Sequence, residues 1–166
     1  MSDASAKRFL GKFRKQTLRG GIAGILGGAV FAVWMAENGV LPVIASMIGG
    51  SSSLLGLLMH LGISVAIGAS FGVLFARLAV GLVPSVLWGL VNGFAWWFLG
   101  PLTLMPLSLG MGLQWTASAV VGTLTSLIWH LVFGGVMGIT YAALTTRVAS
   151  KEQLATRLDH AATGTA

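Results

Sequence analysis

The chain consists of long apolar stretches separated by short segments that are polar or rich in glycine and proline. Four of the apolar stretches are long enough to cross a bilayer as helices, because about 20 apolar residues span its hydrocarbon core. They cover roughly residues 20–36, 53–78, 83–99 and 118–144. This pattern predicts an all-α, polytopic membrane protein with a bundle of four transmembrane helices.

The composition argues against a water-soluble domain. Only 8% of the 166 residues are charged, 55% are hydrophobic, and the mean hydropathy is +0.88. Soluble domains carry about 25% charged residues. The chain has no cysteine, which excludes disulfides, thiolate metal sites and cysteine nucleophiles. A phosphate loop, a nucleophile elbow and paired carboxylates are absent from the sequence as well, so we expect no enzyme.

The ten lysines and arginines predict the topology. Six precede the first apolar stretch, Arg77 lies between the second and third, and three follow the fourth. The two other connections, residues 38–52 and 100–117, have none. Because basic residues stay on the cytoplasmic side, both termini are predicted to be cytoplasmic. The net charge of +6 is expected to meet anionic lipid rather than nucleic acid.

The charge pattern divides the chain into three segments. Residues 1–19 are predicted to be a basic, amphipathic cytoplasmic segment whose helix, over residues 7–19, lies on the membrane surface. Residues 20–147 hold the four transmembrane helices. Residues 148–166 form a polar cytoplasmic tail, in which Ser150 is expected to begin a short helix.

The second and fourth apolar stretches resemble each other. The tripeptide Met-His-Leu around His60 corresponds to Trp-His-Leu around His130, and each histidine lies 17 residues before an arginine, Arg77 or Arg147. The first and third stretches correspond more loosely, through paired glycines and a later proline. We therefore predict two copies of a helical hairpin, related by an axis along the membrane normal.

Small residues recur at every fourth position in all four stretches. Such ridges allow close approach of helix backbones in lipid. The glycines predicted to lie at helix contacts are Gly24, Gly28, Gly68, Gly72, Gly89, Gly93, Gly122, Gly134 and Gly138. The same ridges place His60 and His130 on faces that pack against other helices, and Asn92 is expected to form a hydrogen bond between helices.

Glu37, His60 and His130 form the candidate site. Counted from the cytoplasmic arginines at 1.5 Å per residue, all three lie at nearly one height, roughly 25 Å away. Ionisable groups at such depth are costly and point to function. The three could bind Zn²⁺ or Fe²⁺ with an open coordination position, or pass protons. Haem b held by both histidines is an alternative. In a further alternative the histidines bind no ligand, and both rings only form hydrogen bonds with backbone carbonyls.

Short motifs along this part of the chain are similar to those of one known family. They are Gly21-Ile22-Ala23-Gly24 leading to Trp34-Met35-Ala36-Glu37, His60 with Ser64, Gly89-Leu90-Val91-Asn92-Gly93 with Pro106-Leu107 and Gly110, and Trp129-His130-Leu131-Val132. Over residues 20 to about 144 the chain thereby resembles the YagU family of small bacterial inner-membrane proteins. The resemblance implies a multi-pass protein of the bacterial inner membrane, and it names no substrate.

Three functions remain as alternatives at this point. The first is a non-enzymatic membrane protein whose outer-leaflet Glu/His layer binds a metal ion or responds to protons. The second is a structural or accessory subunit that binds lipid, pigment or a larger membrane complex. The third is a channel or transporter, which would need a homo-oligomer because four helices leave little room for a pore. The lipid bilayer is the partner common to all three.

Overall fold

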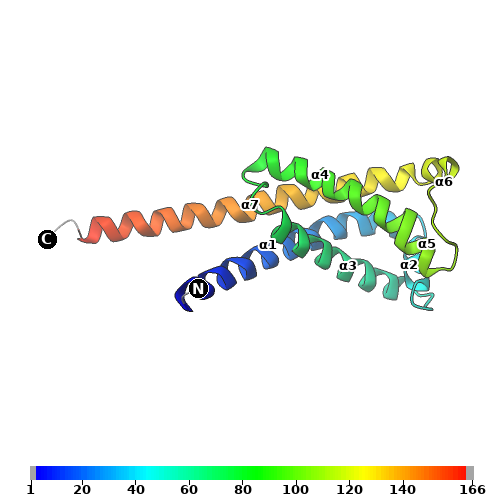
Figure 1. The fold of residues 1–166 in the computed structure, drawn as a ribbon, viewed down its shortest axis with the longest axis horizontal. Helices are drawn as coiled ribbons and strands as arrows, with labels where there is room; N and C mark the ends of the chain where they lie inside the picture. Colours follow the sequence, from blue (N-terminus) through cyan, green and yellow to red (C-terminus); the bar gives the residue numbers. More distant parts are fainter. Residues whose placement is uncertain (1–2, 164–166) are drawn as a thin grey trace.

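The computed structural model describes the backbone of residues 3–163 and the side chains of residues 5–146. Within this range every regular element is a helix, which confirms the all-α prediction (Figure 1). The elements in chain order are α1 (Asp3–Glu37), α2 (Leu41–Ser46), α3 (Ser53–Leu74), α4 (Leu82–Leu99), the π-helix η1 (Gly100–Leu104), α5 (Met105–Ser108), α6 (Ala117–Gly122) and α7 (Leu124–Thr163).

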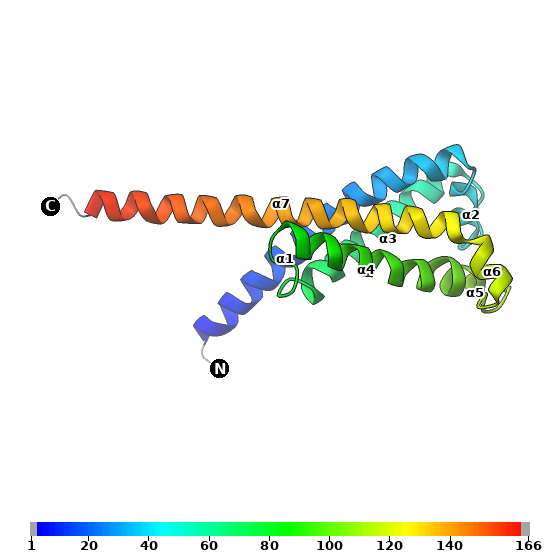
Figure 2. The same ribbon diagram turned by 90° about the horizontal axis from the view of Figure 1, so that it is seen from above.

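Four helical stretches are long and apolar enough to cross a membrane, as the hydrophobic pattern predicts. They are Ser5–Glu37, Ser53–Leu74, Leu82–Ser108 and Leu124–Thr146. The third of them combines α4, η1 and α5. The short helices α2, α5 and α6 lie together at one end of the bundle, while the beginning of α1 and the end of α7 extend from the other end (Figures 1 and 2).

Two helices are longer than predicted. The basic N-terminal segment is not a separate surface helix, because α1 is continuous from Asp3 to Glu37. Similarly, α7 runs from Leu124 to Thr163 and passes through Ser150, where the sequence predicts a new helix. At 1.5 Å per residue, α1 is about 50 Å long and α7 about 60 Å, against about 30 Å of bilayer hydrocarbon. The predicted polar character of residues 148–166 concerns side chains outside the described residues.

Prolines reshape the end of the third apolar stretch. Pro101 has no backbone N–H, so the regular α-helical hydrogen bonding of α4 cannot continue through it, and the chain turns into η1. Pro106 likewise cannot donate to the carbonyl of Leu102. The N–H of Gln114 donates to this carbonyl instead, at 3.0 Å. The connection between α5 and α6 therefore folds back against η1.

The predicted fourth helix is divided into α6 and α7. The helix is interrupted at Thr123, where φ is −106° and ψ is 8°. The carbonyl oxygen of Thr123 accepts from the N–H of Leu127 at 3.0 Å and also from Nε1 of Trp97 at 3.1 Å. Trp97 is buried in α4, and a buried indole N–H requires an acceptor. The break is thus stabilised by a side chain from another helix.

Glycines bring α1 against α3 and α4 against α7. A Cβ atom built on Gly24 of α1 would overlap the carbonyl oxygen of Ser64 and would also meet Gly68, both on α3. The same substitution at Gly89 of α4 would overlap the carbonyl oxygen of Gly134 on α7. Added Cβ atoms would also meet the facing helix at Gly20, Gly28, Gly68, Gly72, Gly93, Gly134 and Gly138. Backbones this close leave no room for a larger residue.

Gly122 differs from the other glycines that are predicted to lie at helix contacts. A Cβ atom built there would have no atom within 4 Å. The reason is that α6 ends at this residue and does not continue the packed face of α7. Gly122 instead lies at the wall of a cavity.

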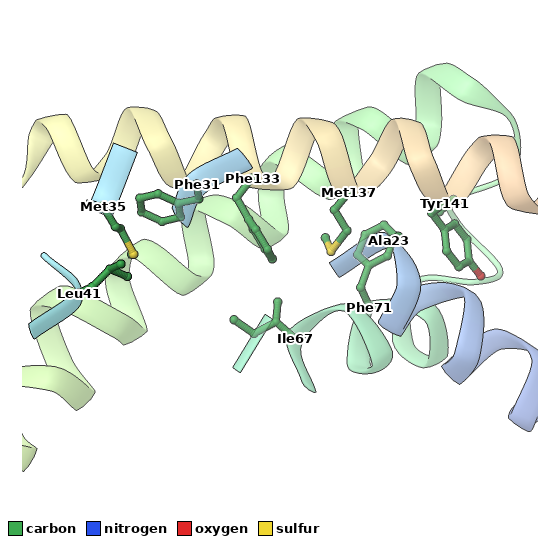
Figure 3. Close-up of a cluster of buried hydrophobic side chains, with 10 residues drawn as sticks. Ala23, Phe31, Met35, Leu41, Ile67, Phe71, Phe133, Met137 and Tyr141 are labelled. Carbon is green, nitrogen blue, oxygen red and sulfur yellow. The ribbon is translucent and has the colours of Figure 1, made fainter. Parts of the chain in front are cut away.

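The two helix pairs meet where α1 crosses α7 (Figure 2). Phe133, Met137 and Tyr141 of α7 are buried there and point toward α3 (Figure 3). The ring of Tyr141 packs edge-on against the ring of Phe71, with 5.4 Å between the ring centroids. In contrast, α3 and α4 do not pack against each other in this way, so the two pairs are joined mainly through α1 and α7.

Asn92 does not behave as the sequence predicts. The side chain is 6% exposed, and its amide nitrogen has no hydrogen-bond partner among the described residues. A buried polar group without a partner costs about 1–3 kcal/mol. We therefore expect Asn92→Leu, which keeps the number and the branching of the side-chain heavy atoms, to stabilise the fold by about 1 kcal/mol, measured as a higher melting temperature in mild detergent. Asn38→Leu is the control, because Asn38 is exposed just after α1 and its amide donates to the carbonyl of Trp34 at 2.9 Å. A lower melting temperature of Asn92→Leu alone would contradict this expectation.

Candidate functional site

A cavity of about 330 Å³ lies between the two helix pairs, beside the short helices. Residues from α1, α2, α3, α4, η1, α5, α6 and α7 form its walls, and most of these residues are apolar. The polar side chains among the lining residues are His60, Ser64, Thr123, Thr125, Ser126 and His130. In the part of the chain that the structure describes, no acidic side chain, lysine or arginine lines the cavity. The site is therefore apolar, with a few groups that form hydrogen bonds.

His60 connects α3 to α1. The side chain is 7% exposed, and its Nε2 lies 3.0 Å from the carbonyl oxygen of Gly28. A carbonyl oxygen can only accept, so Nε2 carries the hydrogen and donates it. No second hydrogen bond of this ring is found among the described residues. In the neutral ring, Nδ1 is consequently an acceptor.

His130 is held within its own helix. Its Nδ1 lies 2.7 Å from the carbonyl oxygen of Ser126, one turn earlier, and 3.3 Å from the Ser126 hydroxyl. Nδ1 thus donates to the carbonyl, which leaves Nε2 as the acceptor of the neutral ring. A Cβ atom built on Gly100 would lie 3.8 Å from Nε2. This nitrogen therefore faces the wall of the cavity that η1 forms.

Phe31 of α1 contacts both imidazoles. Its ring centroid lies 5.4 Å from that of His60 and 4.9 Å from that of His130, with both pairs edge-on. Trp129 stacks on the same ring at 6.3 Å and on Trp34 at 5.7 Å. A phenylalanine side chain, and not an open slot, thus lies against both rings. Haem held by the two histidines would require this aromatic cluster to rearrange.

Glu37 does not join the two histidines. It is exposed at the end of α1 and is not among the residues that line the cavity. The reason is its direction, because Glu37 lies about 200° around the helix from Met35, which does line the cavity. Across the described residues, no group of three or more His, Asp or Glu side chains could hold a metal ion. The metal site expected from Glu37, His60 and His130 is therefore not formed.

Several residues of the site are not foreseen from the sequence. Phe31 looks like any apolar residue of a transmembrane stretch, and Gly100 looks like a helix end. Ser126 carries a usable signal, because it lies four residues before His130 and therefore on the same face of the helix. Thr123 becomes part of the site only through the break between α6 and α7.

The arrangement can hold a small, mostly apolar molecule against two imidazole rings. The Ser64 hydroxyl donates to the carbonyl of His60 in its own helix at 2.7 Å, so it is not paired with an imidazole nitrogen. Comparisons of the chain with protein-family profiles, with curated proteins and with solved structures find no match.

Proposed function

We propose that this chain is a multi-pass, non-enzymatic protein of the bacterial inner membrane that binds a small, largely apolar molecule in the cavity beside His60 and His130. The single observation that carries the proposal is the cavity of about 330 Å³, with apolar walls and an imidazole nitrogen of His130 facing it. Ligand sites are typically concave and apolar, with a few polar groups that orient the ligand.

Immersion in lipid is supported by the outer surface of the helices. Large apolar side chains are exposed along the outer faces of α3 and α4, among them Leu54, Leu58, Leu74, Val83, Leu87 and Phe94. A soluble monomer rarely exposes contiguous apolar surface of this kind. In a bilayer these side chains would meet acyl chains instead of water.

A cytoplasmic position of both termini is supported by charge and shape together. Five of the six basic residues of the first segment precede Gln16, where the backbone of α1 meets Gly72 of α3. The connection that contains Arg77 is at the same end of the bundle (Figure 1). The cavity is at the opposite end, which under this topology lies in the outer half of the membrane.

Duplication of a helical hairpin is supported by matching contacts. Gly24 faces the Ser64 carbonyl and Gly68, whereas Gly89 faces the Gly134 carbonyl and Gly138. If His60 is aligned with His130, and Gly24 with Gly89, these contacts fall at equivalent positions. The two helix pairs thus share one packing register. Membership of a YagU-like family is proposed on the shared sequence motifs alone.

A metal ion or a proton pathway is less well supported than a bound molecule. Two imidazoles supply only two ligands, and Zn²⁺ sites in proteins usually have at least three protein ligands. Proton transfer requires a chain of polar groups, but most of the residues around the two histidines are apolar.

The proposal is tested by identifying what the purified protein retains. We expect organic extracts of the wild-type protein, purified in mild detergent, to contain a small molecule that mass spectrometry detects. Gly100→Leu would place a side chain beside Nε2 of His130, without a clash at Cβ, and should abolish retention. Gly62→Leu is the matched control, because a Cβ atom at Gly62 of α3 has open space around it. Equal retention in both variants would contradict the proposal.

A further inference from the structure

The two histidines are equivalent in the proposed duplication, but their side chains are not arranged in the same way. His60 donates across to Gly28 of α1, whereas His130 donates to Ser126 of its own helix. The counterpart of Gly28 is Gly93, which no ring nitrogen of His130 contacts through a hydrogen bond in the described structure. His130 therefore does not form the hydrogen bond between helices that His60 forms. Its Nε2 lies beside Gly100 instead.

The surroundings of His130 favour an uncharged ligand. The lining residues include no charged group in the described part of the chain, and an ion without a partner is costly to bury. A neutral imidazole that donates through Nδ1 presents only an acceptor at Nε2. A molecule bound there gains a hydrogen bond only if it brings an O–H or N–H donor.

The rim of the cavity indicates where the ligand comes from. Ile63 of α3 and Leu104 of η1 line the cavity and are nevertheless 40% and 49% exposed. They are therefore part of both the cavity wall and the outer surface. Since α3 and α4 do not pack closely on each other, this apolar rim faces the surroundings of the bundle, which are lipid under the proposed function.

We infer that the cavity takes an uncharged, lipid-soluble molecule that donates an O–H or N–H hydrogen bond to Nε2 of His130 and arrives from the bilayer past Ile63 and Leu104. This inference rests on the proposed function and specifies the class of its ligand. A buried acceptor discriminates strongly against an analogue that lacks the donor, because the acceptor is then left without a partner. His60 has a different role and positions α3 against α1.

The test uses three probes that share a hexyl chain and one aromatic ring. 4-Hexylphenol has the O–H donor, 4-hexylanisole has a methyl group in place of its hydrogen, and 4-hexylbenzoate is charged. The full chain is placed in lipid nanodiscs with ¹⁵N-labelled histidine, and only three imidazoles contribute signals, because the sequence has three histidines. His130→Phe identifies the signal of His130 by its loss, and binding to this variant is followed through the ring of His60, which also lines the cavity. Affinities are compared at equal mole fraction in the lipid.

We expect 4-hexylphenol to shift the Nε2 signal of His130 in a saturable way, with an affinity at least tenfold above that of either other probe. His130→Phe should reduce phenol binding to the level of the anisole. If that variant does not fold, Gly100→Leu should have the same effect by filling the space beside Nε2. Equal affinities for 4-hexylphenol and 4-hexylanisole would contradict a ligand that donates a hydrogen bond to Nε2. A higher affinity for 4-hexylbenzoate would contradict an uncharged ligand.

Absence of saturable binding by all three probes would overturn this inference as well. None of these outcomes decides the proposed function, which depends on the molecule that the purified protein retains. The two failures are thereby distinguished.

Discussion

Replacing Gly68 by leucine is expected to separate α1 from α3 and to destabilise the protein by at least about 3 kcal/mol. A Cβ atom at this position would overlap the carbonyl oxygen of Gly20 and would also meet the backbone of Gly24. Overpacking a core typically costs about 1–3 kcal/mol, and here backbone atoms, which cannot turn aside, meet the new side chain. We expect the melting temperature in mild detergent to fall by roughly 10 °C, or the protein not to fold.

Gly62→Leu provides the matched control for Gly68→Leu. Both glycines lie on α3, but a Cβ atom at Gly62 would have no neighbour within 4 Å. Both variants replace a helical glycine by leucine and gain the same helix propensity. A difference between their melting temperatures therefore reports the contact with α1. Similar melting temperatures of the two variants would show that α1 and α3 do not pack through these glycines.

The two histidine substitutions are expected to have different effects. His60→Ala removes a buried ring, which lies between α3 and α1, and leaves the carbonyl of Gly28 without its donor. We expect a loss of about 2–4 kcal/mol in the free energy of unfolding. His130→Ala should cost about 1 kcal/mol, because its ring faces a cavity and its hydrogen bond stays within one helix turn.

The comparison can be sharpened with glutamine. His60→Gln retains a side-chain N–H that can donate to Gly28, so part of the stability lost in His60→Ala should return. Melting temperatures of the three single variants and the double alanine variant provide the measurement. A greater loss for His130→Ala than for His60→Ala would reverse the roles that the structure assigns to the two rings.

Much of the fold can be predicted from the sequence because long apolar stretches and regularly spaced small residues are simple signals. A span needs a long apolar stretch, and helices that pack in lipid need small residues at their contacts. The four long apolar helices are therefore predictable. The break at Thr123 is not, because it depends on the indole of Trp97, which lies 26 positions away in the chain. The sequence also gives no clear indication that α1 and α7 continue beyond the apolar stretches.

The position of each site residue along its helix can be predicted from the sequence, but the direction of its side chain cannot always be predicted. Spacing from the arginines gives the height of Glu37, His60 and His130 along their helices, but it does not give the direction in which each side chain points. Glu37 lies at the end of α1, is exposed, and does not line the cavity. The small-residue ridges do supply a direction for the two histidines. They do not show which nitrogen of each ring is free, since that depends on Gly28 and Ser126.

Everything that is proposed for the cavity depends on four membrane crossings that leave both ends of the chain on one side. The chain has no cysteine, so single cysteines at exposed or half-buried positions outside the helix contacts can be labelled with a membrane-impermeant maleimide. With the proposed topology, Ser51→Cys and Met111→Cys react in intact cells, whereas Gly11→Cys and Val80→Cys react only after the membrane is opened. Reaction of Val80→Cys and Ser51→Cys from the same side of the membrane would contradict the account.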